Sequence, residues 1–497
     1  MKSGKYIIAL DQGTTSSRAV LFDALANVVA IEQQEFSQIY PKAGWVEHDA
    51  NEIWKTQLKV FEDLVAKHVE NVSDIAAIGI TNQRETTLIW DRNTGEPIHN
   101  ALVWQDTRTS DYCERLKRKG LETKVRDSTG LVIDAYFSAT KIIWLLDNVE
   151  GARERAEKGE LMFGTMDSWL VYNLTGKKQH VTDMTNASRT MFYNIQDHRW
   201  DESLLKVLNI PPSLLPEVKN SAAHFGDFEY QGHMIPITGI AGDQQAALFG
   251  QQCFEAGMAK NTYGTGCFML MNIGKEMQLS DNGLITTVGI ALDGKFNYAL
   301  EGSVFVAGAA VQWLRDGLKI IEKASETEQL AKDVIEAHDV VMVPAFVGLG
   351  APYWDMYARG AVFGLTRDTN YKHLVKATLE SLAYQTRDII IAMQKDAGYE
   401  LKSLKVDGGA VANNYLMQFQ ADILQVNVER PAVIESTAQG AAYLAGLGCG
   451  LWTLDELSAY RELDAVFEPV MKKEQADKLY RQWQKAVKRT MNWVEDD

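Results

Sequence analysis

Three short turns rich in glycine and in hydroxyl side chains are the parts of this sequence best suited to chemistry on phosphate. They lie at residues 13–17, directly before Arg18, and at residues 262–266 and 406–413. Glycine lets backbone N–H groups approach phosphate oxygens without a Cβ in the way, and serine or threonine hydroxyls add donors. Each turn alone could be an ordinary hairpin or strand-to-helix turn, but the three together favour phosphoryl transfer or ATP hydrolysis.

Two aspartates could supply acid–base and metal chemistry. Asp11 ends an apolar run directly before the first turn, where a carboxylate is costly unless it is used, and Mg²⁺ is a suitable ligand for it. Asp243 follows the apolar run at residues 235–240 and two small residues. We expect Asp243 to be the general base that accepts the proton of an attacking hydroxyl, and a cap on a helix over 244–250 is the alternative role. Both carboxylates are candidate metal ligands.

Arg84 and Glu85 are the candidate side chains for holding the acceptor. They follow the apolar run at residues 75–80, and an adjacent donor and acceptor can share the hydroxyls of a polyol between them. Trp104 and Tyr136 could add an apolar wall and a further hydroxyl. The alternatives are a surface ion pair for the dipeptide and simple core packing for the two rings.

The composition limits the partners and the compartment. The 497 residues include 66 acidic and 50 basic side chains, and the resulting charge of -16 repels nucleic-acid backbones and anionic lipid. Only four cysteines occur, in no Cys-x-x-Cys pair, so we expect neither disulfides nor a zinc site. No apolar run is long enough to cross a bilayer and no signal peptide is recognisable. These features predict a cytoplasmic protein without nucleic-acid or membrane partners.

The elements that must position these residues alternate between strands and helices. Apolar runs flank the turns at residues 13–17 and 262–266, so each turn is the tip of a predicted hairpin. Strands such as 75–80 and 404–406 alternate with helical patterns, of which residues 375–393 give the clearest apolar stripe. The sequence therefore predicts an α/β protein, and the recurring hairpin suggests a diverged duplication.

The length predicts more than one domain. No flexible linker separates the halves, and we place the boundary near Gly250, giving an N-terminal domain over 1–249 and a C-terminal domain over 250–497. No Gly-x4-Gly-Lys-Ser/Thr loop and no set of protein-kinase motifs occurs, which excludes the two best-known nucleotide-binding folds.

Several longer segments resemble the FGGY carbohydrate kinases of the actin-like ATPase superfamily, over essentially the whole chain. The family patterns are at residues 136–148 and 360–365, and segments similar to the glycerol-phosphorylating members are at 44–48, 81–87, 242–250 and 345–354. The resemblance implies two actin-like (ribonuclease H-like) α/β domains with a central cleft. It also implies ATP-dependent phosphorylation of glycerol to sn-glycerol 3-phosphate by in-line transfer, with Mg²⁺, in a homodimer or homotetramer.

The resemblance also assigns site residues. It implies that seven side chains hold glycerol: Arg84, Glu85, Trp104, Tyr136, Asp243, Gln244 and Phe268. It implies that nine residues line the nucleotide site: Thr14, Thr15, Ser16, Arg18, Thr265, Gly308, Gln312, Gly409 and Asn413. Asn413 would be available to hydrogen-bond a base or ribose lying against the glycines. The alternatives are another sugar or polyol kinase of the family, or an actin-like ATPase without an acceptor.

One loop differs from the positions that regulate some members of the family. The arginine that binds fructose 1,6-bisphosphate in some bacterial members corresponds to Met234 here. The histidine that is phosphorylated in many Gram-positive members corresponds to Glu229 or Tyr230, and His233 is nearby but out of register. We therefore expect neither form of regulation.

Overall fold

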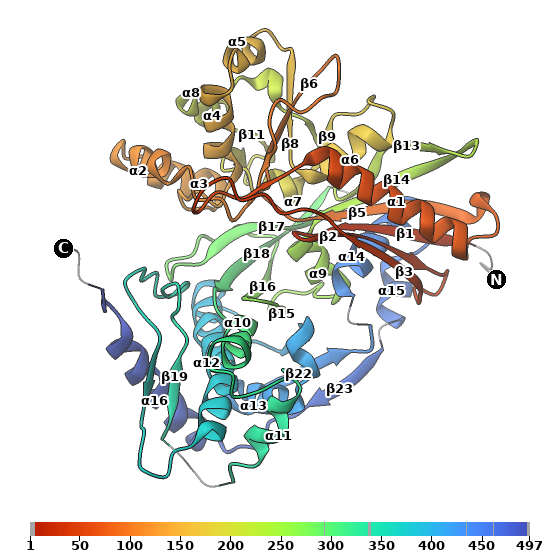
Figure 1. Cartoon of the computed structure of the whole chain (residues 1–497). Coiled ribbons are helices and arrows are strands. Elements are labelled where there is room, and N and C mark those ends of the chain that lie inside the picture. Colours follow the sequence, from red (N-terminus) through yellow and green to blue (C-terminus); the bar gives the residue numbers. More distant parts are fainter. Residues whose placement is uncertain (1–4, 293, 336–338, 434, 461, 495–497) are drawn as a thin grey trace.

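The computed structural model describes residues 5–292, 294–335, 339–433, 435–460 and 462–494, and its core consists of two mixed β-sheets (Figure 1). The first sheet has the strand order β13 (Ala222–Tyr230), β14 (His233–Gly242), β5 (Ile75–Asn82), β1 (Tyr6–Gln12), β2 (Ser16–Phe22) and β3 (Val28–Glu35). The second has the order β17 (Ile285–Leu292), β18 (Lys295–Val304), β16 (Cys267–Gly274), β15 (Ala259–Tyr263), β21 (Ser403–Asp407), β22 (Asn427–Pro431) and β23 (Leu463–Phe467). The predicted α/β class is confirmed.

The two sheets repeat one plan. In the first sheet the hairpin β1–β2 is followed by β5 and β14, which run parallel to β1, and by the antiparallel strand β13. In the second sheet the hairpin β15–β16 is followed in the same way by β21, β22 and the antiparallel β23. Both predicted hairpins are therefore present. The shared order of the hairpin and the two parallel strands supports the predicted duplication, whereas the antiparallel edge strand precedes its neighbour in the first half (β13 before β14) and follows it in the second (β23 after β22).

Helices and short strand pairs surround the sheets. The helices of the first half are α1 (Ala50–His68), α2 (Ser110–Arg118), α3 (Glu122–Thr129), α4 (Ser138–Asn148), α5 (Ala152–Glu157), α6 (Met166–Leu174), α7 (Met184–Ala187), α8 (Glu202–Leu208) and α9 (Asp243–Gly250). Those of the second half are α10 (Gly308–Gln312), α11 (Glu326–Lys332), α12 (Tyr371–Ala397), α13 (Asn414–Leu424), α14 (Ser436–Gly448), α15 (Leu454–Ala459) and α16 (Lys473–Thr490). The short pairs are β4 (Glu47–His48) with β7 (Ala101–Leu102), β6 (Leu88–Asp91) with β8 (Leu161–Gly164), β9 (Val181–Asp183) with β12 (Glu217–Lys219), β10 (Tyr193–Asn194) with β11 (Arg199–Trp200), and β19 (Val341–Val343) with β20 (Ala361–Phe363).

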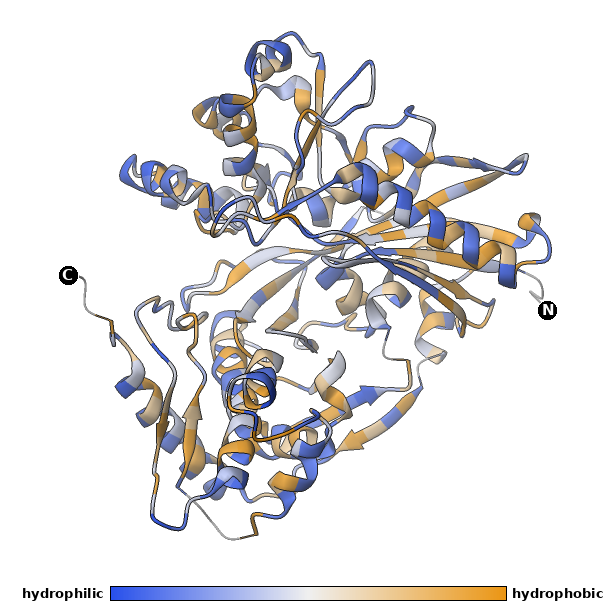
Figure 2. Cartoon of the chain, viewed as in Figure 1, coloured by the Kyte–Doolittle hydropathy of each residue, from blue (hydrophilic) through white to orange (hydrophobic). Residues whose placement is uncertain are grey.

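Burial follows the apolar patterns of the sequence. Ile7 to Leu10 of β1 are almost fully buried, as expected for a central strand covered on both faces. In Figure 2 most strands of the first sheet carry mainly hydrophobic residues, whereas α1 shows hydrophilic residues along its outer face. The predicted stripe of α12 is buried, and this helix ends at Gly398, whose left-handed φ of 67° suits glycine. Within the described ranges, no helix combines the length and the apolar character needed to span a membrane.

Helix α14 crosses from the second half of the chain onto the first sheet. It packs against α9 and against β14, β5 and β1, close to the first sheet in Figure 1. The last strand of the first sheet ends at Gly242 and the second sheet begins at Ala259, so the proposed boundary near Gly250 falls between the sheets. The boundary remains a prediction, because α14 belongs to the second half by sequence and to the first sheet by packing.

Substitution of Gly440 should loosen this crossing. A Cβ at Gly440 in α14 would lie 1.9 Å from the carbonyl oxygen of Ala246 in α9, and that backbone cannot rotate away. We expect Gly440→Val to lower the free energy of unfolding by about 3 kcal/mol in urea denaturation, the upper end of the range of about 1–3 kcal/mol that overpacking costs, because the clash is with backbone. Gln439→Val, at the neighbouring half-buried position, is the matched control and should cost much less. Equal losses in the two variants would contradict a tight contact at Gly440.

Candidate active site

A cavity of about 130 Å³ lies between the ends of the first-sheet strands and strand β16 of the second sheet. We call it the aromatic cavity, and its lining residues are Thr14, Arg84, Glu85, Trp104, Tyr136, Asp243, Gln244 and Phe268. The parallel strands β1, β5 and β14 end side by side at Gln12, Asn82 and Gly242, so the residues that follow them meet at one edge of the sheet. The structure thus brings together all seven side chains expected to hold the acceptor, with Thr14, which we expected at the nucleotide site.

Three rings form the walls of the aromatic cavity. The Trp104 ring lies 5.6 Å from that of Tyr136 and 6.3 Å from that of Phe268 between centroids, nearly perpendicular to both. Trp104 Nε1 donates to Thr14 Oγ1 at 3.0 Å, so its polar edge is satisfied. The ring faces therefore offer an apolar surface that suits the carbon backbone of a small ligand.

Arg84 and Glu85 are buried, so a surface ion pair is the wrong interpretation of this dipeptide. Their side chains are 2% and 1% exposed, and the Arg84 Nε to Glu85 Oε1 distance is a long 3.9 Å. The strong partners of Arg84 are Glu301, at 2.6 Å from Nη1, and Asp243, at 3.1 Å from Nε. Glu85 has a left-handed φ of 61°, a strained conformation for a residue with a Cβ and one that clusters at functional sites.

Sequence reasoning missed two charged residues behind the aromatic cavity, Arg189 and Glu301. Arg189 donates to Glu85 Oε1 at 2.6 Å and to Glu301 Oε1 at 3.0 Å. Burial raises the pKa of Glu301, but the guanidiniums of Arg189 and Arg84 outweigh this and lower it to about 2. The available signal was the single acidic residue of strand β18, which directly follows the buried residues Tyr298, Ala299 and Leu300.

Asp243 is the first residue of α9, and its side chain is 32% exposed. Its Oδ1 accepts the backbone N–H of Gln244 at 2.7 Å, whereas the N-cap position itself is Gly242. The carboxylate therefore contacts the first turn of the helix without occupying the cap position. It remains accessible to a ligand in the aromatic cavity.

A buried lysine that no sequence motif had singled out supports Gln244. Lys260 Nζ donates to Gln244 Oε1, to Thr262 Oγ1 at 2.8 Å and to the Phe268 carbonyl at 3.2 Å. Burial lowers the pKa of Lys260 to about 8, although Asp407 and Asp243 favour its charged form. The contacts with Thr262 and Phe268 hold the ammonium group in place, and its third hydrogen bond orients the Gln244 side chain.

Two glutamines and a histidine hold the first glycine-rich turn. Gln83 Nε2 donates to the Gly13 carbonyl at 3.2 Å, and Gln38 Nε2 donates to the Thr14 carbonyl at 3.1 Å. His48 lies between them, with Nε2 2.8 Å from Gln38 Oε1 and Nδ1 3.3 Å from Gln83 Nε2. Neutral His48 can thus donate to one glutamine and accept from the other, and both support the turn.

Protonation of His48 should destabilise the protein below neutral pH. Burial lowers the pKa of His48 from 6.5 to about 4. The unfolded chain therefore takes up the proton first, so the contribution of His48 is complete above pH 6.5 and falls as the pH drops toward 4. We expect the advantage in unfolding free energy of wild type over His48→Gln to shrink across this window in urea titrations. The same advantage at about pH 7.5 and about pH 4.5 would contradict this role.

Arg18 and Asp11 face a third charged group that we did not predict. Arg18 Nη1 pairs with Glu435 and lies 3.9 Å from Asp11 Oδ2. Burial raises the pKa of Asp11 to about 6. The positive charge of Arg18 lowers this pKa, and the negative charges of Asp243 and Glu435 raise it. The described residues contain no cluster of three or more histidine, cysteine or acidic side chains that could hold a metal. The carboxylates of Asp11 and Asp243, which are close enough to interact electrostatically, still fit Mg²⁺. This ion usually combines one or two carboxylates with waters and substrate phosphates.

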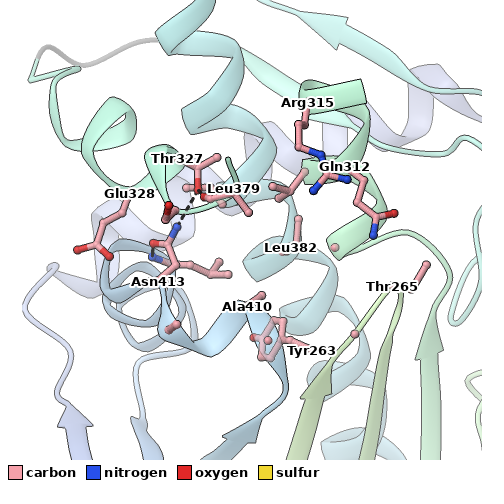
Figure 3. Close-up of a pocket in the computed structure, with 18 residues that line it drawn as sticks. Tyr263, Thr265, Gln312, Arg315, Thr327, Glu328, Leu379, Leu382, Ala410 and Asn413 are labelled. Carbon is pink, nitrogen blue, oxygen red and sulfur yellow. Dashed lines mark hydrogen bonds between the residues drawn. The ribbon is translucent and has the colours of Figure 1, made fainter. Parts of the chain in front are cut away.

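A second cavity, of about 470 Å³, lies within the C-terminal half (Figure 3). We call it the glycine-lined cavity, and five predicted nucleotide residues line it: Thr265, Gly308, Gln312, Gly409 and Asn413. Leu379 and Leu382 of α12 add apolar surface. Thr15, Ser16 and Arg18 do not line it, because they lie at the first glycine-rich turn and the start of β2, in the other half of the chain.

Asn413 is less available than we expected. Its Oδ1 accepts the N–H of Leu416 at 3.0 Å and caps α13, and its Nδ2 donates to Thr327 Oγ1 at 3.1 Å. Figure 3 shows this side chain turned toward Thr327, with Gln312 and Arg315 on the opposite side of the cavity. Both polar atoms of this side chain thus have partners within the protein, whereas we expected the side chain to be available to a base or ribose.

Comparisons with known proteins agree with this geometry. Models of the N-terminal and C-terminal domains of the FGGY family of carbohydrate kinases match residues 6–250 and 259–449. Over 493 residues the chain is 63% identical to the glycerol kinase of Carboxydothermus hydrogenoformans and 62% identical to that of Alkaliphilus metalliredigens. Both alignments cover 98% of this chain and 99% of the relative.

Solved structures are similar over the same length. The structure of Plasmodium falciparum glycerol kinase with ADP superimposes with a TM-score of 0.93 at 38% identity and covers 99% of both chains. The gluconate kinase of Lactobacillus acidophilus gives a TM-score of 0.87 at 22% identity over 98% of both chains, which supports the fold alone. The similarity thus spans both sheets and both cavities.

Proposed function

The chain belongs to the FGGY family of carbohydrate kinases, and from that membership we propose that it phosphorylates glycerol with ATP, releasing sn-glycerol 3-phosphate and ADP. Relatives named glycerol kinase align with it from end to end at more than 60% identity. Membership alone leaves the acceptor open, because the family fold also occurs in sugar and sugar-acid kinases.

The aromatic cavity is the observation that carries the choice of glycerol. Its volume of about 130 Å³ is small, and its walls combine three rings with the charged side chains of Arg84, Glu85 and Asp243. The rings suit a short carbon backbone, while Arg84 can donate to hydroxyls and Glu85 can accept from them. A three-carbon polyol fits this combination better than a pentulose or an aldonic acid.

Asp243 is the proposed general base. Its partly exposed carboxylate lines the cavity, and the ion pair with Arg84 Nε at 3.1 Å orients it. As the glycerol oxygen forms its bond to the γ-phosphorus, the hydroxyl proton passes to Asp243 and the bond to ADP breaks. Positioning and neutralisation of charge supply most of the remaining rate.

The glycine-lined cavity is the proposed site of the adenosine part of ATP. Its glycines leave room for a planar base against the backbone, and the turn at residues 13–17 offers backbone donors to the phosphates. Arg18 adds positive charge at that turn. When bound, Mg²⁺ would neutralise charge on the phosphates, and Asp11 and Asp243 are the carboxylates that would hold it.

A coupled assay of ADP release tests this proposal. The acceptors are glycerol, dihydroxyacetone, xylulose, gluconate and none, with ATP and Mg²⁺ present throughout. We expect the highest kcat/KM with glycerol and only slow ATP hydrolysis without an acceptor. Faster turnover of xylulose or gluconate would assign the chain to another kinase of the family. ATP hydrolysis at the same rate with and without every acceptor would indicate an ATPase instead.

A further inference from the structure

Four buried charged side chains form a network at the aromatic cavity: Arg84 and Glu85 line the cavity, and Arg189 and Glu301 lie behind them. Arg84 donates to both carboxylate oxygens of Glu301, from Nη1 at 2.6 Å and from Nη2 at 3.0 Å. Arg189 joins Glu301 to Glu85, with hydrogen bonds of 3.0 and 2.6 Å. The four residues are at most 3% exposed. Two positive and two negative charges balance one another, which buried charges require.

Glu301 reaches this network from the second sheet. It lies 217 positions from Arg84 in the sequence, in the middle of β18. It is paired across the sheet with Leu270 of β16 on one side and Ile285 of β17 on the other. Because strands on both sides fix its backbone, Glu301 presents a carboxylate that cannot follow movements of the loop that carries Arg84.

The bidentate contact determines how Arg84 faces the ligand. A planar guanidinium bound through two parallel N–H groups can neither tilt nor rotate freely. Its Nη1 also donates to Gln245 Oε1 at 3.2 Å, and its Nη2 to the Tyr136 hydroxyl at 3.4 Å. The hydrogen bond to Tyr136 is the longest of these and therefore the weakest. A ligand hydroxyl can replace Tyr136 as the acceptor of this Arg84 N–H at the least cost.

Arg189 connects the same network to the rest of the cavity wall. Its guanidinium carbon lies 5.7 Å from the Tyr136 ring centroid and 5.3 Å from that of Phe137. It therefore contacts Tyr136 and, through its hydrogen bond, Glu85, without lining the aromatic cavity itself.

We propose that Glu301 is a positioning residue for the acceptor: it fixes the Arg84 guanidinium from the second sheet, with Arg189 as the counter-ion that keeps its charge balanced. This inference rests on the proposed glycerol kinase activity. Its consequence is that acceptor recognition depends on a residue that touches neither acceptor nor nucleotide and belongs to the opposite sheet.

Kinetics of Glu301→Gln test the proposal. Glutamine keeps the shape of the side chain but removes the charge and one of the two acceptors for Arg84. We expect the KM for glycerol to rise about 10²-fold, as misplacement of a binding group by about 1 Å can cause, while ADP affinity and acceptor-free ATP hydrolysis stay unchanged. The preference for glycerol over 1,2-propanediol or 1,3-propanediol should fall. Each diol has one hydroxyl fewer than glycerol, so misplacement of Arg84 removes fewer hydrogen bonds from a diol than from glycerol. An equal loss with all three acceptors would overturn the proposal.

A second variant separates positioning from charge balance and from folding. Arg189→Gln combined with Glu301→Gln removes one charge of each sign, so the buried network remains neutral. We expect this double variant to melt close to wild type yet keep the raised KM for glycerol. A wild-type KM in the double variant would show that Glu301 only balances charge. Wild type measured alongside keeps the two proposals distinct, since its failure to phosphorylate glycerol would refute the proposed function and not the role of Glu301.

Discussion

Asp243→Asn should lower kcat for glycerol phosphorylation by about 10²–10⁴-fold, the usual contribution of a general base. The amide has nearly the shape of the carboxylate but cannot take up the hydroxyl proton. Its oxygen can still accept the Gln244 N–H, which is 2.7 Å from Asp243 Oδ1 in the wild type. It can also remain beside Arg84 Nε. The loss should therefore appear in kcat, measured by coupled ADP release at saturating glycerol and ATP.

The controls for this variant are binding and stability. ADP affinity, measured by calorimetry without Mg²⁺, and the melting temperature should match wild type, because the glycine-lined cavity does not include Asp243. A decrease in kcat of less than about tenfold would show that Asp243 orients the acceptor without taking its proton. Loss of ADP binding even without Mg²⁺ would contradict the proposed separation of Asp243 from the adenosine site.

Local sequence patterns predicted the elements that present the site. The hairpins around residues 13–17 and 262–266 were predictable because an apolar run, a glycine turn and a second apolar run are contiguous. Helix α12 was predictable from its period, since Val375 and Met393 lie on one buried stripe. These signals depend only on neighbours in the chain.

The partners of the site residues could not be predicted in this way. The burial of Arg84 depends on Glu301, 217 positions away, and the pairing of Arg18 depends on Glu435, 417 positions away. A single sequence does not indicate which distant strands will lie opposite one another. The sequence therefore left a surface ion pair open as the alternative role of Arg84 and Glu85, although the strongest contacts of Arg84 are long-range.

Asn413 differs from the sequence-based prediction because a local contact competes with a ligand for its side chain. Asn413 follows a strand and two glycines, which suggested a side chain free for a nucleotide, yet it is also a good residue to begin α13. Its Oδ1 serves the helix. Asn413 lines the cavity all the same, so its position was predictable and its hydrogen bonds were not.

Gly409→Leu should weaken ADP binding without destabilising the protein. A Cβ at Gly409 would meet no other atom within 4 Å, and Gly409 lines the glycine-lined cavity. A larger side chain can therefore be accommodated by the fold, but it fills space that we assign to the nucleotide. Forcing a ligand into an overfilled site costs about 1–3 kcal/mol, which corresponds to roughly 5- to 150-fold weaker binding. Calorimetry with ADP measures this, and melting without nucleotide checks the fold.

The neighbouring glycine provides the contrast that makes this result specific. Gly408 has a φ of 90°, and a Cβ there would lie 2.4 Å from the carbonyl oxygen of Tyr263. Gly408→Ala should therefore lower the melting temperature, whereas Gly409→Ala, →Val and →Leu should lower only ADP affinity, in the order of their size. Unchanged ADP affinity along the Gly409 series would place the nucleotide elsewhere. A parallel loss of stability along that series would mean that the space beside Gly409 is needed by the fold and not by a ligand.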